Sequence, residues 1–173
     1  MMRAVYNERS ECFTASEASA QQRALNSERS TQSLNRSPMK AITPYLNFDG
    51  RTHEAMTFYH KILGGDLDMQ TFGDIKAPGP PGSEKRVVHA RITNGPVVLM
   101  ASDTMPGMPF VQGNNIHINI DCDNIAELER LFAAFGEGGN VTMPLTDQFW
   151  GARFGMLTDK FGVLWMFNCE LPK

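Results

Sequence analysis

The chain has 173 residues, of which 42% are hydrophobic and 20% charged, and its formal net charge is −3. These values are ordinary for a globular domain, and the negative balance argues against a protein held to nucleic acid by a broad basic surface. No run of 18 apolar residues occurs, so we expect no membrane partner. The three cysteines, Cys12, Cys122 and Cys169, form no CxxC pair, which favours a reducing, cytoplasmic location over a disulfide framework or a zinc knuckle.

Residues 1–38 differ in composition from the rest of the chain. They hold seven serines and five arginines but few large apolar residues. Such a segment buries too little surface to offset the entropy lost on ordering. We therefore expect a disordered or weakly structured extension, with a short amphipathic helix around 18–25 as an open alternative. Met39 directly precedes the first strand-like run and is interpreted as the natural start of one domain over 39–173.

The first half of this domain predicts the order strand, helix, strand, strand, strand. A strand over 41–48 ends at the Asp49-Gly50 turn, and apolar residues at helical spacing then continue to Gly64-Gly65, which ends the helix. Three further strands are expected at 66–73, 85–93 and 96–102, with a Gly- and Pro-rich loop over 73–86 and a hairpin turn at Asn94-Gly95.

The second half predicts the same order again after a linker over 104–115. In NNIHINIDCD (114–123) isoleucines alternate with polar residues, which indicates a strand with one buried face. We expect Ile116, Ile118 and Ile120 to pack against the helix that follows. Asn124, with Glu127 three residues later, resembles the cap of that helix. Strands are then expected over 140–145, 149–157 and 163–168.

An internal repeat relates the two halves. A shift of 73 residues superposes the two helix patterns, so that Tyr59 meets Phe132 and Gly65 meets Gly138. Two such βαβββ units, about 40–103 and 114–170, cannot form a solenoid, which needs more repeats. They predict an α+β domain in which two units form a concave, cup-shaped mixed sheet with the helices on its outer face.

The chain resembles the vicinal oxygen chelate superfamily, which includes glyoxalase I, extradiol dioxygenases and bleomycin-resistance proteins, and within it the PhnB-like branch. The resemblance rests on ITPYLNFDGRTHEAMTFYHKILGG, VVHARITNGPVVLMASD, NNIHINIDCD and FWGARFGMLTDKFGVLWMFN, and covers roughly residues 40–170. It implies a homodimer in which the partner completes the cup. Similar proteins sometimes carry a methyltransferase label, but no strand leads into a glycine-rich turn that would hold a nucleotide-like cofactor.

The resemblance also implies a divalent metal, held by His or Gln on the first strand and Glu on the last strand of each unit. The repeat locates these four positions at Pro44, Leu99, His117 and Met166. Proline and leucine cannot ligate, and a thioether is a poor ligand for such ions. We therefore expect no metal and no other cofactor.

His117 is the expected catalytic residue, acting as a general base or hydrogen-bond donor in the cup. A solvated histidine on the polar face of a strand is the alternative. His89, which alternates with apolar neighbours, Arg153, which can clamp an anion, and Trp150, which can form an apolar wall, are expected substrate-binding residues together with Leu99 and Met166. A solvated strand edge for Arg153 and core packing for Trp150 remain alternatives.

The internal repeat and the apolar periodicity give opposite predictions for the facing of the first strand. The repeat places Ile42, Pro44, Leu46 and Phe48 on the cup side, whereas periodicity alone buries them under the helices. If the repeat holds, half of the cup is apolar and suits a hydrophobic or aromatic ligand. The sequence thus predicts a PhnB-like protein that acts on a small, partly apolar molecule without the usual metal, either as a glyoxalase-like lyase or isomerase or as a non-catalytic binding protein of the bleomycin-resistance type.

Overall fold

The computed structural model describes residues 40–76 and 78–172. The expected extension, its helix around 18–25 and Met39 lie outside the described residues. The fold that follows is that of the unit Ile42–Lys173. Neither helix in the described part of the chain is long and apolar enough to cross a bilayer.

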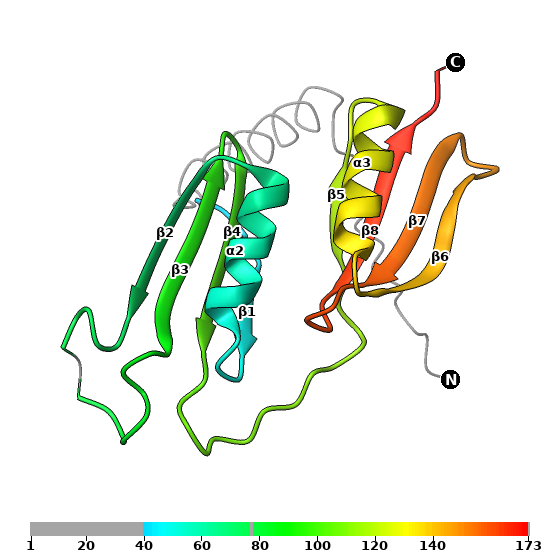
Figure 1. The fold of residues 1–173 in the computed structure, drawn as a ribbon. Coiled ribbons are helices and arrows are strands. Elements are labelled where there is room, and N and C mark those ends of the chain that lie inside the picture. The colour runs from blue at the N-terminus through cyan, green and yellow to red at the C-terminus, as the bar shows by residue number, and fades with distance from the viewer. Residues whose placement is uncertain (1–39, 77, 173) are drawn as a thin grey trace, which may run out of the picture. The chain divides into compact units, whose positions relative to one another are not determined.

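Two βαβββ units follow each other along the chain, as predicted (Figure 1). Unit one consists of β1 (Tyr45–Phe48), α2 (Thr52–Leu63), β2 (Asp66–Thr71), β3 (Val87–Asn94) and β4 (Val97–Asp103). Unit two consists of β5 (Ile118–Asp121), α3 (Ile125–Gly136), β6 (Asn140–Asp147), β7 (Ala152–Thr158) and β8 (Leu164–Glu170).

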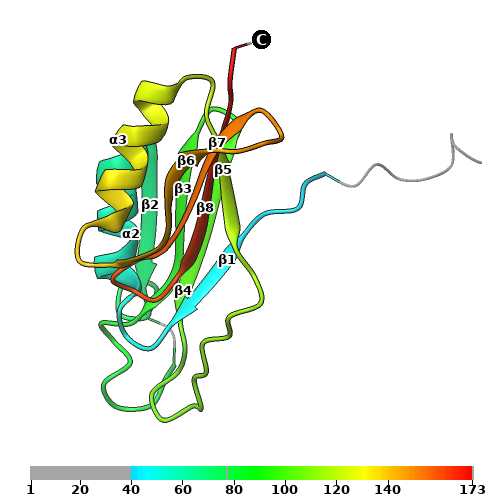
Figure 2. The ribbon, with the colours of Figure 1, turned by 90° about the vertical axis from the view of Figure 1, so that its right-hand side faces the viewer.

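Each unit forms its own four-stranded mixed sheet. The strand orders are β1-β4-β3-β2 and β5-β8-β7-β6. The first strand of each unit pairs in parallel with the last, and the other neighbours pair antiparallel. Both helices lie on the same side of the strands (Figure 2). The predicted class, α+β with two βαβββ units and a cupped sheet, is confirmed.

Local sequence determines where the helices begin and end. The Asn124 side chain accepts a hydrogen bond from the Glu127 N–H at 2.9 Å, which confirms the predicted cap of α3. The Glu127 carboxylate binds Arg130 instead of returning to the cap, so only half of a capping box forms. After α2 the chain turns at Gly65, whose φ is +82° and where a Cβ would collide with the carbonyl of Thr93.

Aromatic residues join the two units in one core. Tyr59 of α2 stacks on Phe135 of α3, with ring centroids 5.8 Å apart, and meets the edge of Trp165 of β8 at 5.5 Å. All three side chains are almost fully buried. Burial of such large rings supplies much of the stabilisation of a domain of this size.

A buried carboxylate, Asp159, sits at the centre of this joint. Its Oδ2 accepts from the Tyr59 hydroxyl at 2.6 Å and from Trp165 Nε1 at 2.8 Å, while Oδ1 accepts from the N–H groups of Phe161 and Val163 at 2.8 and 3.0 Å. Four donors satisfy a carboxylate that is only 4% exposed. Burial, followed by the nearby Asp159 charge, raises the pKa of Tyr59 far above its ordinary value, so the phenol stays a donor.

The side chains of β1 face as periodicity predicts, and the orientation inferred from the 73-residue repeat is wrong for Phe48. Phe48 is 3% exposed in the core, and Leu46 packs against the same core. Asn47 pairs with Ser102 and lies five residues before α2, whereas its counterpart Asp121 pairs with Asn168 and lies four residues before α3. The 73-residue offset that superposes the two helices is therefore one residue out of register for the first strands. A shift of one residue along a strand exchanges its buried face for its open face.

The isoleucines of β5 pack only in part as predicted. Ile118 and Ile120 are half-buried against the core that contains Leu128 and Leu131. Ile116 is 75% exposed, because the strand begins two residues later, at Ile118.

Candidate functional site: the open face of the sheets

The sheet faces that α2 and α3 leave uncovered form the candidate site, and we call them the open face. Along a strand, alternate residues point to opposite faces. In β8, Trp165 and Phe167 are buried in the core, whereas Met166 and Asn168 are half-buried on the opposite side. Residues that pair directly with Met166 or Asn168 on neighbouring strands share the open face.

On unit one, an imidazole and a phenol meet on the open face. The rings of Tyr45 and His89 stack with centroids 5.9 Å apart, and the Tyr45 hydroxyl lies 3.2 Å from Nδ1 of His89. Beside them the Ser102 hydroxyl donates to the Asn47 amide oxygen at 3.3 Å. Arg91, two residues beyond His89 on β3, is exposed. This half of the open face is polar and can exchange hydrogen bonds with ligand oxygens or nitrogens.

On unit two, the corresponding row consists of three methionines. Met143 of β6 pairs with Met156 of β7, which pairs with Met166 of β8, and Met166 pairs with Asn119 of β5. All three methionines are half-buried. Flexible thioether side chains in contact with water form an adaptable apolar surface.

An acceptor group borders the methionine row. The Asp121 carboxylate receives hydrogen bonds from the side-chain amides of Asn119 at 2.8 Å and Asn168 at 3.0 Å. Asn168 pairs on its other side with Phe154. The two amides fix the position of the carboxylate, which keeps further lone pairs for a ligand.

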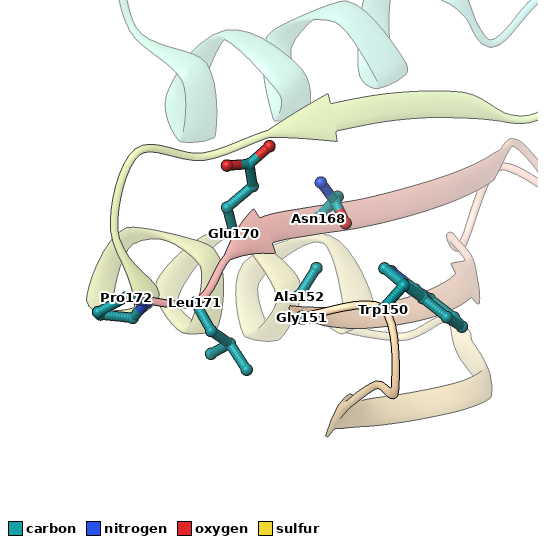
Figure 3. Close-up of a pocket in the computed structure, with 7 residues that line it drawn as sticks. All are labelled: Trp150, Gly151, Ala152, Asn168, Glu170, Leu171 and Pro172. Carbon is teal, nitrogen blue, oxygen red and sulfur yellow. The ribbon is translucent and has the colours of Figure 1, made fainter.

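A cavity of about 730 Å³ lies where this face meets the end of β8 (Figure 3). Asn168, Glu170 and Ala152, which pairs with Glu170, contribute its strand residues. Trp150, in the turn before β7, forms one wall and meets Phe154 edge-on at 6.0 Å. A volume of this size is typical of small-molecule sites.

The structure brings three of the predicted site residues to the open face or its rim: His89, Met166 and Trp150, which is 53% exposed. His117 is half-buried immediately before β5. Within 40–76 and 78–172 no hydrogen bond reaches the His117 imidazole, whereas on the open face the imidazole of His89 is oriented by the Tyr45 hydroxyl.

Two other predicted residues lie on the helix side. Leu99 is 3% exposed and belongs to the core. Arg153 lies on the same side of β7 as Gly155 and Leu157, and its guanidinium binds Glu129 of α3 at 2.8 Å and Asp147 at 2.7 Å. Both placements follow from strand pairing, because Leu99 pairs with the buried Ile92 and Arg153 with the buried Cys169.

Sequence reasoning missed Tyr45, the two other methionines of the row, Met143 and Met156, and the Asn119–Asp121–Asn168 group. Tyr45 could have been found from the alternation of Leu46 and Phe48 alone. The methionines come from three strands, and only the register of the sheet brings them together.

Together, the two βαβββ units, their parallel pairing of first and last strands and the uncovered cupped face define a glyoxalase-fold protein. The chain belongs to the Glyoxalase/Bleomycin resistance protein/Dioxygenase superfamily, whose family model matches residues 42–167.

Known relatives cover the same domain. Protein YjdN from Escherichia coli is 30% identical over 139 residues, which is 73% of this chain and 93% of that protein. The crystal structure of protein PA1353 from Pseudomonas aeruginosa shows 47% identity and a TM-score of 0.71, covering 78% of this chain and all of that one. The PhnB protein from Bacillus cereus shows 27% identity and a TM-score of 0.62, covering 75% and 99%.

The open-face donors do not fit the metal centre that the family resemblance implies. The hydrogen-bonding and thioether residues of the first and last strands on the open face are Tyr45, Asn47, Met100 and Ser102 in unit one and Asn119, Asp121, Met166, Asn168 and Glu170 in unit two. This set contains two carboxylates and no imidazole. In the described part of the chain, no three His, Cys, Asp or Glu side chains lie close enough together to hold a metal ion.

Proposed function

We propose that the protein binds a small, partly apolar molecule on the open face without the metal centre usual in its superfamily. The row Met143–Met156–Met166 carries this proposal, because these three half-buried methionines are partners on adjacent strands, Met156 and Met166 in regular pairing and Met143 between two register shifts of β6. Next to them, the fixed Asp121 carboxylate and the Tyr45–His89 pair offer the few polar groups that orient a ligand in such sites.

The proposal includes a homodimer, in which a second copy covers part of the open face and shields the ligand from water. It rests on the family resemblance and on the sheet faces that α2 and α3 leave uncovered. The molecular mass in solution, measured by light scattering with and without ligand, tests this part separately.

Methionine-methyl NMR tests the binding proposal. The full chain, labelled with 13C-methyl methionine, is titrated with the neutral apolar probe N-phenyl-1-naphthylamine. We expect the Met156 and Met166 methyl signals to shift, because the probe lies on them. The methyl of Met56, which is fully buried in α2, is the internal control.

A matched pair of variants sharpens this test. Met166→Gln keeps the length of the side chain but replaces the thioether with an amide, and we expect it to weaken probe binding by roughly tenfold. Met69→Gln, on the helix side of β2, is the comparison. The proposal would be overturned by methyl shifts confined to residues off the open face. It would also be overturned if Met166→Gln bound the probe as tightly as the unaltered chain.

One observation favours a second function, catalysis without metal. The Tyr45–His89 hydrogen bond is the arrangement in which a phenol orients an imidazole for general acid–base work. In place of His117, the structure offers His89 as the candidate base. An assay with the hemithioacetal of an α-ketoaldehyde, run after chelator treatment, tests it: turnover that is lost in His89→Ala and kept in His117→Ala supports this function.

A further inference from the structure

The cavity beside Trp150 has the chemistry of a cation site. Its lining includes the indole of Trp150, the carboxylate of Glu170 and the amide of Asn168, which is bound to the Asp121 carboxylate (Figure 3). Neither lysine nor arginine is among the described residues that line it. A carboxylate and the face of an aromatic ring each attract an organic cation and repel an anion.

In unit one, an arginine side chain occupies the corresponding end of the sheet. Arg86 immediately precedes β3, and its Nη1 donates to the Asp49 carboxylate and to the Thr104 carbonyl, both at 2.7 Å. The guanidinium is largely buried, with its side chain 18% exposed. Unit one therefore supplies a cation from its own chain at this end of the sheet.

The register identifies the matching positions in unit two. Met100 and Met166 are equivalent, because each pairs with the first and the third strand of its own sheet. Four residues after them lie Thr104 and Glu170, which are therefore equivalent as well. Where Arg86 precedes β3, Gly151 precedes β7, and a Cβ built on Gly151 meets no atom within 4 Å. Unit two thus has a carboxylate-bearing residue at this end, and a glycine at the position of Arg86.

We propose that this cavity binds an organic cation, a guanidinium, amidinium or ammonium group on an apolar body. The inference rests on the proposed function and names its ligand class. The cationic group lies against the Glu170 carboxylate, and the Trp150 ring lies on the other side of the cavity (Figure 3). The apolar body extends past Phe154 toward Met156, which follows Phe154 by two residues on the same face of β7.

Three ligands of one shape and different charge test the charge preference. Benzamidinium is cationic, benzamide neutral and benzoate anionic, and all three carry the same ring. Binding to the full chain is measured by calorimetry and by saturation-transfer NMR at low salt. We expect benzamidinium to bind at least tenfold more tightly than benzamide, and benzoate to bind most weakly.

Variants assign the effect to this cavity. Glu170→Gln removes the charge and keeps the shape, and we expect it to weaken benzamidinium roughly fivefold, as for a solvent-exposed ion pair, while benzamide is unaffected. Trp150→Leu weakens benzamidinium by a similar factor. Glu137→Gln, an exposed glutamate after α3, is the matched control and leaves binding unchanged.

The outcomes separate this inference from the proposed function. Equal affinity for benzamidinium and benzamide, tighter binding of benzoate, no binding of any of the three, or no effect of Glu170→Gln overturns the cation site. The methionine-methyl shifts with the neutral probe do not depend on charge, so they decide independently whether the open face binds apolar molecules.

Discussion

At the scale of single residues, Asp159 has the clearest energetic role. In Asp159→Asn one oxygen becomes an NH2 group that faces two donors, either the N–H groups of Phe161 and Val163 or those of Tyr59 and Trp165. We expect a loss of roughly 2–4 kcal/mol in the free energy of unfolding, measured by urea denaturation. Asp74→Asn, at an exposed turn, is the control. Equal stabilities of the two variants would contradict this role.

Cys122 gives a second prediction at this scale. Burial, followed by the negative charge of Glu127, raises the pKa of its thiol to about 11. Since the thiolate is the reactive form, alkylation of Cys122 by iodoacetamide at pH 8 should be slower than in the urea-unfolded chain, on the order of 100-fold, and should speed up as the pH approaches 11. Peptide mass mapping measures it. Equal rates in the folded and unfolded chains would refute the prediction.

At the scale of secondary-structure elements, the cap of α3 is open to a direct test. Asn124→Ala removes the acceptor for the Glu127 N–H and leaves an unpaired donor at the first turn. The expected loss of stability is about 1 kcal/mol, measured by chemical denaturation. Asn140→Ala, exposed at the start of β6, is the matched substitution and should change stability by less than about 0.5 kcal/mol.

The strand β5 provides a test of its facing. Ile118→Ala should cost roughly 1–3 kcal/mol, less than for a fully buried isoleucine, because Ile118 is half-buried against the core. Ile116→Ala should cost little, because Ile116 is 75% exposed. Thermal and chemical unfolding of both variants measure the difference. A larger loss for Ile116→Ala would mean that β5 begins earlier and that Ile116 packs against the core.

At the scale of the whole molecule, we expect the domain to be stable without residues 1–38. The motivation is the composition of that segment and the position of Met39. A chain that begins at Met39 should melt within a few degrees of the full chain, a difference of about 1 kcal/mol or less. Calorimetry of both chains measures this. Insolubility of the shorter chain, or a loss of several kcal/mol, would show that the segment packs on the domain.

The elements and fold class could be predicted because they depend on local periodicity. The apolar spacing before Gly64, the Asn124 cap and the Asn94-Gly95 turn all occur where the structure has a helix end, a helix start and a hairpin. These signals come from neighbours in the sequence, where backbone geometry alone fixes the pattern.

The site could be predicted only in part, because it depends on register between distant strands. Leu99 and Arg153 lie on the helix side because they pair with the buried residues Ile92 and Cys169 on neighbouring strands. Nothing local in the sequence distinguishes Met156 from a core methionine. Its pairing with Met143 and Met166 is what places it on the open face.

The alternation of buried and open residues along β7 and β8 also has an evolutionary consequence. Trp165 and Phe167 hold the domain together, whereas Met166 and Asn168, their immediate neighbours, contribute little to the core. Mutations at the second set can accumulate without unfolding the protein. A duplicated unit built in this way can acquire a new ligand preference in one half while the other half retains the old one.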